Sequence, residues 1–262
     1  MNYQHIEFEI AANAGIIWLN RPDVHNAMNA EMIGEIVDAF EKVNDMEEVR
    51  YVILRGRGKS FCAGADLNYM KGIATFGFDE NYQDGLKLAK CFNAVYTCRK
   101  PTVAVVHGAA IGGANGLLAA CDMVYCMDDT KFAFAEVKLG IAPATISPYV
   151  CKRIGEYGAR DLMITGRRFQ GREAESFRLV NRSFETEEAL EEQLAFTHKM
   201  LMSSGPNAMG ATKELIYNLF NKYNFEDSID YTAKLIATLR ASEEGQEGMA
   251  SFLEKRKPNW NE

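Results

Sequence analysis

The segment PTVAVVHGAAIGGANGLLAACDMVYCM, residues 101–127, decides the fold class. An apolar run at 103–106 leads into a Gly/Ala-rich turn at 107–116, and a second apolar run follows at 123–126. Short apolar runs bounded by glycine predict buried strands, and the turn between them predicts the start of a helix. Because strand and helix alternate, the segment favours an α/β arrangement over a β-sandwich.

The residues before this segment continue the same pattern. Apolar side chains alternate along residues 6–10, and a more buried run follows at 15–19, which together predict a strand hairpin. Asn29 is expected to cap a helix, and residues 51–54 read as a further buried strand. A polar helical segment with apolar positions between 82 and 95 then leads to Lys100 and Pro101.

Strand signals end near residue 185, and helical patterns occupy 190–202, 208–220, 229–239 and 249–253. We therefore expect an α/β core over 1–185 and a helical C-terminal region over 186–262. Apolar residues in the helical region, such as Phe220, Tyr231, Leu235 and Leu239, exceed what one small core would cover. Such a surplus favours burial between subunits.

Composition and charge narrow the class of partner. The chain has 262 residues, of which 47% are hydrophobic and 25% charged, so it can form a packed core rather than a disordered chain. Its formal net charge of −7 argues against a nucleic-acid partner. Two basic runs, 55–59 and 255–257, are read as solvated surface segments, with a cluster for an anionic ligand as the alternative.

Targeting and redox signals predict a cytoplasmic protein that does not enter a membrane. The first residues lack the basic and apolar regions of a signal peptide, and no apolar run approaches about 18 residues. The six cysteines form no C-x-x-C pair and lie in apolar contexts. We expect free, buried thiols in a reducing compartment.

Several common catalytic motifs are absent from the sequence or incomplete. Gly58-Lys59-Ser60 resembles the end of a P-loop, but Ile53 stands where that motif needs glycine. No G-x-S-x-G elbow is present, and the four histidines lack metal-ligand spacing. NTPase, serine hydrolase and zinc enzyme are therefore disfavoured, and no metal is expected.

Two glycine-rich turns and one glutamate carry the candidate chemistry. The turns at 60–67 and 107–116 each follow an apolar strand, and together they could offer backbone N–H groups to an oxyanion. Each turn alone is better explained by close packing of a helix on a sheet. Glu136 lies in the apolar stretch 132–140, where burial would raise its pKa and suit it to proton transfer. The alternative is an edge-strand glutamate that faces water.

These features together resemble the crotonase (enoyl-CoA hydratase/isomerase) superfamily over essentially the whole chain. The segments that carry the resemblance are Leu19-Asn20-Arg21-Pro22, Asn26-Ala27-Met28-Asn29, residues 61–67, residues 108–116, Cys121-Asp122, Thr165-Gly166 and residues 252–258.

The resemblance implies a spiral of ββα turns and C-terminal helices that build a homotrimer or a hexamer. It implies a CoA thioester as substrate, no separate cofactor, and catalysis by Glu136 with the N–H groups of Ala65 and Gly113. Phe252 and Lys255 match positions that contact the CoA adenine and phosphate. The remaining positions expected at the substrate are Ala63, Asp66, Leu67, Gly112, Gly116 and Ala144.

One position departs from the pattern. Many hydratases of the family hold the attacking water with two glutamates, and Gly116 occupies the first of these positions. Residues 136–150 resemble a bacterial subgroup of methylglutaconyl-CoA or isohexenylglutaconyl-CoA hydratases. We therefore expect hydration of a branched enoyl-CoA by Glu136 alone. Around Gly116, either backbone groups hold the water or the missing side chain makes room for the branch. A Δ3,Δ2-enoyl-CoA isomerase and a non-catalytic acyl-CoA-binding protein remain the alternatives.

Overall fold

The computed structural model describes residues 1–261, which divide into two compact units. Unit 1 contains Met1–Cys98 and Thr102–Glu192. Unit 2 contains Arg99–Pro101 and the chain from Gln193 onward.

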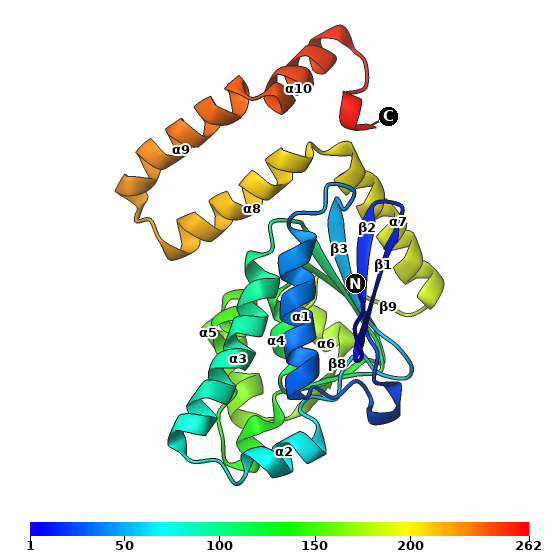
Figure 1. Cartoon of the computed structure of the whole chain (residues 1–262), viewed down its shortest axis with the longest axis vertical. Helices are drawn as coiled ribbons and strands as arrows, with labels where there is room; N and C mark the ends of the chain where they lie inside the picture. The colour runs from blue at the N-terminus through cyan, green and yellow to red at the C-terminus, as the bar shows by residue number, and fades with distance from the viewer. Residues whose placement is uncertain (262) are drawn as a thin grey trace. The chain divides into compact units, whose positions relative to one another are not determined.

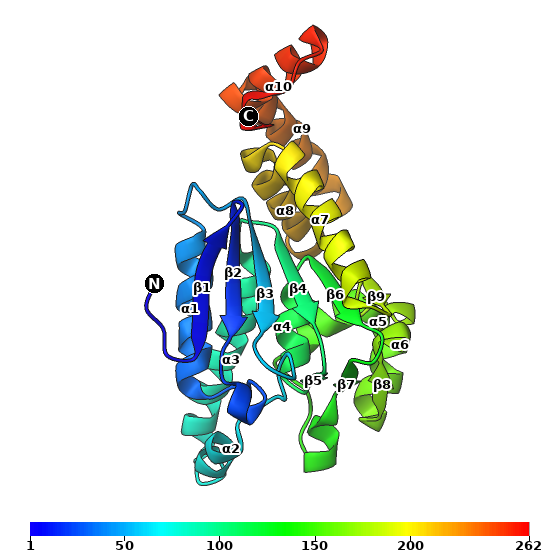
Figure 2. The same ribbon diagram turned by 90° about the vertical axis from the view of Figure 1, so that its right-hand side faces the viewer.

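Unit 1 is built on a six-stranded sheet with the order β1-β2-β3-β4-β6-β9 (Figure 2). β1 and β2 are antiparallel, and every later pair is parallel. All five residues of β4 are buried, as expected for a strand covered on both faces. The strands are β1 (Ile6–Ala11), β2 (Ala14–Leu19), β3 (Tyr51–Gly56), β4 (Thr102–Val106), β6 (Met123–Met127) and β9 (Arg182–Phe184).

A second sheet of three short strands follows the larger one. It contains β5 (Ala109–Ile111), β7 (Lys131–Ala133) and β8 (Arg168–Gln170) in that order. After β4 the chain enters β5, and after β6 it enters β7, so successive turns add one strand to each sheet. This arrangement confirms the predicted α/β fold with ββα turns. The sequence patterns missed the small sheet because each of its strands has only three residues.

Four helices of unit 1 contact one another in the order α1–α3–α4–α5 and pack beside the larger sheet (Figure 1). Asn29 caps α1 as predicted, since its side chain accepts a 3.0 Å hydrogen bond from the Met32 N–H. The helical segments are η1 (Pro22–Val24), α1 (Ala30–Val43), α2 (Leu67–Ile73), α3 (Phe78–Thr97), α4 (Ala114–Ala120), η2 (Ala135–Leu139), α5 (Ser147–Thr165) and α6 (Gly171–Ser176).

The end of α6 is strained at Arg178. The Arg178 N–H donates to Glu175 O and the Leu179 N–H donates to Ala174 O, which form a Schellman turn. Arg178 then has φ +62°, in the left-handed region where glycine is usual. A residue with a Cβ loses about 1–2 kcal/mol there, and a cation near a helix C-terminus regains only about 0.3–1 kcal/mol.

Unit 2 is helical, as predicted for the end of the chain. Its helices are the later part of α7 (Glu187–Ser203), α8 (Pro206–Asn221), α9 (Phe225–Ala241), α10 (Glu243–Glu254) and η3 (Asn259–Asn261). The Glu244 carboxylate accepts hydrogen bonds from Asn207 N–H (2.9 Å) and Ala208 N–H (2.8 Å), which ties α10 to the start of α8. None of the 17 residues of α9 is buried.

The structure explains the first basic run as surface charge. Arg55 pairs with Glu191, and Arg57 pairs with Glu7 at 2.7 Å while lying over the Trp18 ring. An anion would have to displace these carboxylates, so Arg55 and Arg57 offer no prepared anion site.

Two sequence predictions can be compared with the structure: that the cysteines are free and buried, and that the protein does not enter a membrane. All six cysteines are free, and five are buried, but Cys151 is exposed. The prediction of a buried thiol is therefore wrong at Cys151, which lies on the outward face of α5. Of the helices in residues 1–261, none combines the length and apolar character needed to cross a membrane.

Candidate active site

The two glycine-rich turns lie side by side. The Phe61 N–H donates to His107 O (2.9 Å), the Cys62 N–H donates to Ala109 O (3.0 Å), and the Ile111 N–H donates to Cys62 O (3.1 Å). Gly64 has φ +99°, and a Cβ there would lie 2.8 Å from the Ile111 carbonyl oxygen. Glycine is therefore required at this close approach of the two turns.

Met28 links the two backbone groups expected to bind an oxyanion. Its backbone forms an isolated bridge with Ala65, and its terminal methyl group would lie 2.8 Å from a Cβ on Gly113. Within residues 1–261, neither the Ala65 N–H nor the Gly113 N–H donates a hydrogen bond to the protein. Ala65 is exposed and Gly113 half-buried, so both donors remain available to a ligand.

The register of β5 and β7 brings Glu136 to the second turn. Ile111 pairs with Ala133, and the Gly112 N–H donates to Ala133 O (2.9 Å). Glu136 follows in η2, and its Oε1 would lie 3.3 Å from a Cβ on Gly112. The missing side chain at Gly112 therefore leaves the Glu136 carboxylate beside the turn. The glutamate lies in a 3-10 helix rather than in the edge strand considered from sequence.

Burial raises the pKa of Glu136 above its ordinary value of 4.5, and a hydrogen bond from its own backbone offsets only part of this effect. Its Oε2 atom is buried, and no donor among residues 1–261 reaches it. A buried acceptor without a donor is uncommon and costly. Glu136 therefore has the protonation behaviour and the free oxygen that a general acid/base needs.

Asn115 holds this arrangement together, and motif reasoning did not single it out. Its fully buried amide donates to the carbonyl oxygens of Ala110 (3.3 Å), Gly112 (3.2 Å) and Ala133 (3.0 Å). These bonds join the end of β5 to the end of β7. A buried polar residue inside an apolar helix start was the signal that could have identified it.

Comparison with known proteins decides the family. The model of the enoyl-CoA hydratase/isomerase family matches residues 9–262. The chain belongs to the enoyl-CoA hydratase/isomerase family. The family consists of hydratases and isomerases, and the chain is an enzyme of this kind.

Relatives carry both activities in their names. A candidate enoyl-CoA hydratase of Thermus thermophilus is 36% identical over 95% of this chain and 97% of its own length. A peroxisomal Δ(3,5)-Δ(2,4)-dienoyl-CoA isomerase of Arabidopsis thaliana is 31% identical over 92% of this chain and 90% of its own length. Among solved structures, Pseudomonas aeruginosa AtuE superposes with a TM-score of 0.95 at 34% identity, covering 99% of this chain and 100% of its own.

The surroundings of Gly116 correct the expectation of free space in this family member. A Cβ on Gly116 would lie 2.5 Å from Ile146 Cγ2 and 2.8 Å from the Phe92 ring. Ile146 and Phe92 are themselves buried, with exposures of 1% and 0%. The prediction that Gly116 makes room for a branch is therefore wrong, because two apolar side chains already fill the space. A second glutamate there would have to displace both.

Asp66 has a structural task in addition to its predicted place at the substrate. Its carboxylate caps α2 through Asn68 N–H (2.8 Å) and Tyr69 N–H (3.1 Å), and it pairs with Arg21 at 2.9 Å. Burial alone would raise the pKa of Asp66, but the bonds from Tyr69, Arg21 and Asn68 hold it below its usual value. This ion pair fixes the start of α2 immediately after Ala65.

The other predicted substrate positions of unit 1 lie on the chain segments that flank the turns. The Ala63 N–H donates to His25 O (2.9 Å), and Leu67 is 75% exposed at the start of α2. Ala144 is exposed in the segment before α5, where its carbonyl accepts from the Ser147 N–H. Exposed apolar side chains at Leu67 and Ala144 are suited to contact an acyl chain.

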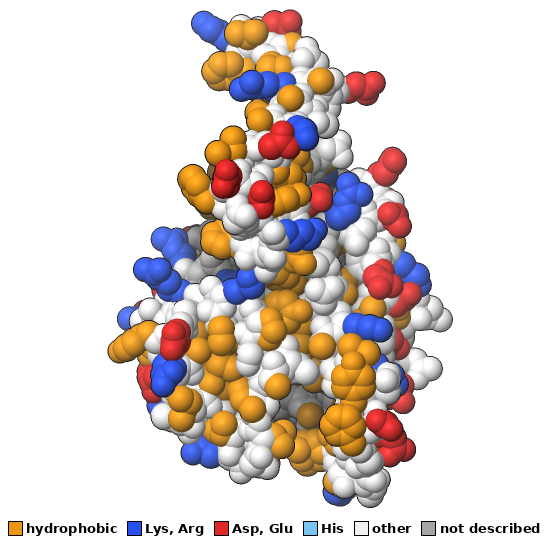
Figure 3. All heavy atoms as spheres, turned by 90° about the vertical axis from the view of Figure 1, so that its left-hand side faces the viewer, with side chains coloured by type: hydrophobic (Ala, Val, Ile, Leu, Met, Phe, Trp, Pro, Cys, Tyr) orange, Lys and Arg blue, Asp and Glu red, His pale blue; other side chains and the backbone are white. Residues whose placement is uncertain are grey.

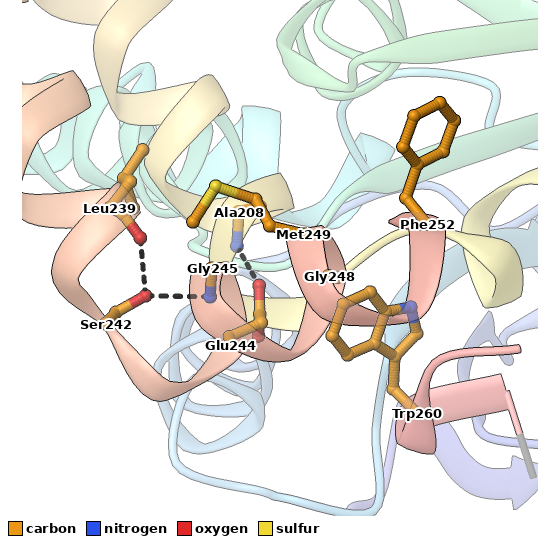
Figure 4. A pocket seen from close by; sticks show the side chains of 10 residues that line it. Ala208, Leu239, Ser242, Glu244, Gly245, Gly248, Met249, Phe252 and Trp260 are labelled. Atoms are coloured by element: carbon orange, nitrogen blue, oxygen red, sulfur yellow. Dashed lines mark hydrogen bonds between the residues drawn. The ribbon is translucent and has the colours of Figure 1, made fainter. Parts of the chain in front are cut away.

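The predicted CoA contacts Phe252 and Lys255 belong to unit 2. Phe252 is 82% exposed and borders a cavity of about 460 Å³ that Met249 and Trp260 also line (Figure 4). Lys255 ends α10 in the left-handed conformation, with φ +57°. Its neighbour Arg256 is held by both carboxylate oxygens of Glu247, at 2.6 and 2.7 Å.

No group of three or more His, Cys, Asp or Glu side chains in residues 1–261 is placed to hold a metal ion. The residues brought together in unit 1 are thus one carboxylate, two free backbone donors and an apolar wall of Met28, Phe92 and Ile146.

Proposed function

We propose that the protein adds water to the double bond of a 2-enoyl-CoA thioester, with Glu136 as the single acid/base. The observation that carries this proposal is the buried, unpaired Oε2 of Glu136 beside the free N–H groups of Ala65 and Gly113. The names of the Thermus relative and of the family agree with hydration.

The proposed reaction needs one proton carrier. The Glu136 carboxylate takes a proton from water, and the resulting hydroxide bonds to Cβ of the substrate. The electron pair of the double bond moves toward the thioester, whose oxygen accepts hydrogen bonds from Ala65 N–H and Gly113 N–H. The protonated Glu136 then returns its proton to Cα, which restores the carboxylate. Two donors held ready for the developing oxyanion stabilise this step, and one such donor is worth about 10²–10³ in rate.

Double-bond isomerisation is the second candidate, and the apolar wall at Gly116 supports it. Glu136 would take a proton from C2 of a 3-enoyl-CoA and return it to C4, with the same enolate in the same hole. This reaction consumes no water, and Phe92 and Ile146 leave no place on α4 for a second water-binding acid. The Arabidopsis relative, named as a dienoyl-CoA isomerase, shows that the family includes such chemistry.

The two candidates are separated by incubating the purified protein with 2-enoyl-CoA and 3-enoyl-CoA thioesters. Hydration removes the ultraviolet absorbance of a conjugated 2-enoyl thioester and adds the mass of one water. Isomerisation creates that absorbance from a 3-enoyl thioester at constant mass. Addition of water to the 2-enoyl thioester supports the hydratase proposal. If the protein only isomerises the 3-enoyl thioester, the hydratase proposal is wrong and the isomerase proposal takes its place. Binding of both thioesters without any turnover would support the non-catalytic alternative.

We also propose that the natural acyl chain is branched, as in 3-methylglutaconyl-CoA. The support for this is the sequence of residues 136–150, whereas Gly116 no longer contributes, since its surroundings are filled. A series of straight, methyl-branched and carboxylate-bearing 2-enoyl thioesters tests the proposal. A higher kcat/KM for the branched members supports it, and a preference for crotonyl-CoA contradicts it.

The CoA part of the substrate is assigned to Phe252 and Lys255 as a proposal, and no further cofactor is required. Exposed Phe252 offers an apolar face for a base, and Lys255 offers a cation for a phosphate. Lys255→Ala is expected to raise KM more than it lowers kcat. The same loss for a short N-acetylcysteamine thioester, which lacks the nucleotide, would contradict this assignment.

A further inference from the structure

Unit 1 contains a cavity of about 560 Å³ between α5 and the turn after α6. Figure 1 shows both helices. Gly155 interrupts α5 with φ +67°, and a Cβ there would meet nothing within 4 Å. This break opens one side of the cavity. Its lining consists of Lys152, Arg153, Ile154, Gly155, Tyr157, Ser176, Phe177 and Arg178.

The cavity is positively charged. Three of its eight lining residues are cations and none is a carboxylate. Lys152 and Arg178 are both exposed, and neither makes an ion pair within residues 1–261. In a chain with a net charge of −7, a group of cations without acidic partners needs an explanation.

Arg153 contributes a half-buried charge that no carboxylate contacts. Its guanidinium donates to Cys121 O (2.6 Å), Leu179 O (3.0 Å) and Asn181 Oδ1 (2.6 Å), which are all neutral acceptors. These bonds fix the position of the side chain, and the Asp122 carboxylate attracts its charge through space without a hydrogen bond to it. An anion in the cavity would gain from this fixed charge.

The acidic residues next to the cavity are engaged elsewhere. Glu156 pairs with Arg160 at 3.1 Å, and Glu173 pairs with Arg167 at 2.7 Å. Glu175 accepts from the backbone N–H of Ser183 (2.8 Å). Asp122, which attracts Arg153 through space, accepts from the Thr102 N–H (2.7 Å) and the Thr102 hydroxyl (2.9 Å). None of these four carboxylates lines the cavity, which therefore keeps its positive character.

Arg178 is held in a backbone conformation that its side chain disfavours. With φ +62° at the end of α6, glycine would relieve the strain and keep the turn. Strain of this kind is found where a side chain has a task. Here the strained residue is one of the two cations at the cavity that lack ion pairs.

An aromatic surface adjoins the cations. Tyr157 stacks on Phe177, with ring centroids 6.5 Å apart and an interplanar angle of 26°, and Tyr157 is 85% exposed. An exposed ring beside a cationic cavity offers a flat apolar face to a planar group. The volume lies within the range of small-molecule sites, about 300–1,000 Å³.

We propose that this cavity binds a small molecule through a phosphate group, held by Lys152 and Arg178. None of its lining residues belongs to the Glu136 site, so the proposal stands apart from the reaction assigned above. The shared chemistry is the phosphate, which either a free inorganic anion or a nucleotide can supply. Stacking on Tyr157 distinguishes the two sources.

The test is isothermal titration of the full-length protein with pyrophosphate and, separately, with ADP. Lys152→Ala and Arg178→Gln are each expected to weaken binding tenfold or more. Arg178→Gly is expected to weaken binding equally while raising Tm by about 2–4 °C, since it removes both the cation and the strain. Lys87→Ala, which removes an exposed cation on α3 outside the cavity, is the control and is expected to bind as the wild type does.

Each result decides the proposal. If the protein binds ADP but not pyrophosphate, and Tyr157→Ala weakens ADP binding, the natural ligand is a nucleotide. If it binds both equally, and Tyr157→Ala changes neither affinity, the ligand is an inorganic anion. Absence of saturable binding by the wild type overturns the site. Equal weakening in Lys87→Ala would mean that binding depends only on overall charge, and this result overturns the site. Loss of binding in Lys255→Ala but not in Arg178→Gln also overturns it, in favour of a site in unit 2.

Discussion

The helices of unit 1 and unit 2 differ in how much of their apolar surface is buried. Every residue of α4 in unit 1 is buried, whereas none of α9 in unit 2 is. Phe225 and Ile229 of α9 are 90% and 64% exposed, and Phe220 of α8 is 77% exposed. Figure 3 shows hydrophobic side chains on the C-terminal helices, and also on the face of unit 1 in view. Helix α4 therefore lies in a closed core, while α8 and α9 present apolar surface that one chain leaves uncovered.

The largest expected effect tests whether unit 1 alone carries the chemistry. Glu136→Gln keeps the shape of the side chain but removes the proton carrier, and turnover of the enoyl-CoA substrate is expected to fall about 10²–10⁴-fold. Thioester binding is expected to persist. Steady-state kinetics and titration with a non-reactive acyl-CoA measure the two quantities, and Glu41→Gln, exposed on α1, is the control. A Glu136→Gln variant with most of its activity would move the chemistry to another residue.

The closed packing of unit 1 can be broken with a single methyl group. Gly116→Ala places a Cβ against Ile146 and Phe92 and is expected to lower the free energy of unfolding by about 1–3 kcal/mol. Gly34→Ala is the same change on α1, where a Cβ meets nothing within 4 Å, and it is expected to add about 0.5–1 kcal/mol. Urea unfolding of both variants gives the comparison. Equal effects at the two sites would mean that Gly116 is not tightly packed.

The open surface of unit 2 predicts self-association. We expect trimers or hexamers at micromolar concentration, because pairing of chains is one way to bury α8 and α9. Ile229→Asp is expected to weaken assembly about tenfold or more, since it adds a charge to the apolar surface. Lys234→Ala, which removes an exposed ion pair with Asp230, is the control on the same helix. Analytical ultracentrifugation measures both, and a monomeric wild type would contradict the prediction.

A smaller effect follows from the burial of Glu136 in unit 1. Its carboxylate must be deprotonated to accept a proton from water, so activity falls as the pH falls through its pKa. Because burial raises that pKa above 4.5, the acid limb of kcat/KM is expected above pH 4.5. A limb at or below pH 4.5 would contradict the raised pKa.

The same shift has a consequence for stability. A raised folded-state pKa favours folding at low pH, and this contribution is lost as the pH rises through the folded pKa. Glu136→Gln lacks the titration, so its stability relative to the wild type is expected to increase from pH 4 toward neutrality. Denaturant unfolding at several pH values measures the difference.

The residue patterns alone determined the strand–helix alternation, the Asn29 cap and the helical end of the chain. These features depend on side chains close together in the sequence, where the period of apolar residues and the local hydrogen bonds decide the structure. The two glycine turns and Glu136 were also recognisable, because each follows an apolar run with an unusual composition.

Only the tertiary structure decided what surrounds these residues. Gly112 and Gly116 lie four positions apart, yet one adjoins the Glu136 carboxylate and the other adjoins Ile146 and Phe92. The buried amide of Asn115 and the strained backbone of Arg178 likewise acquire their significance from distant partners. Contacts across strand registers and between helices depend on the whole fold, so neighbouring residues of one type in the sequence can meet opposite environments.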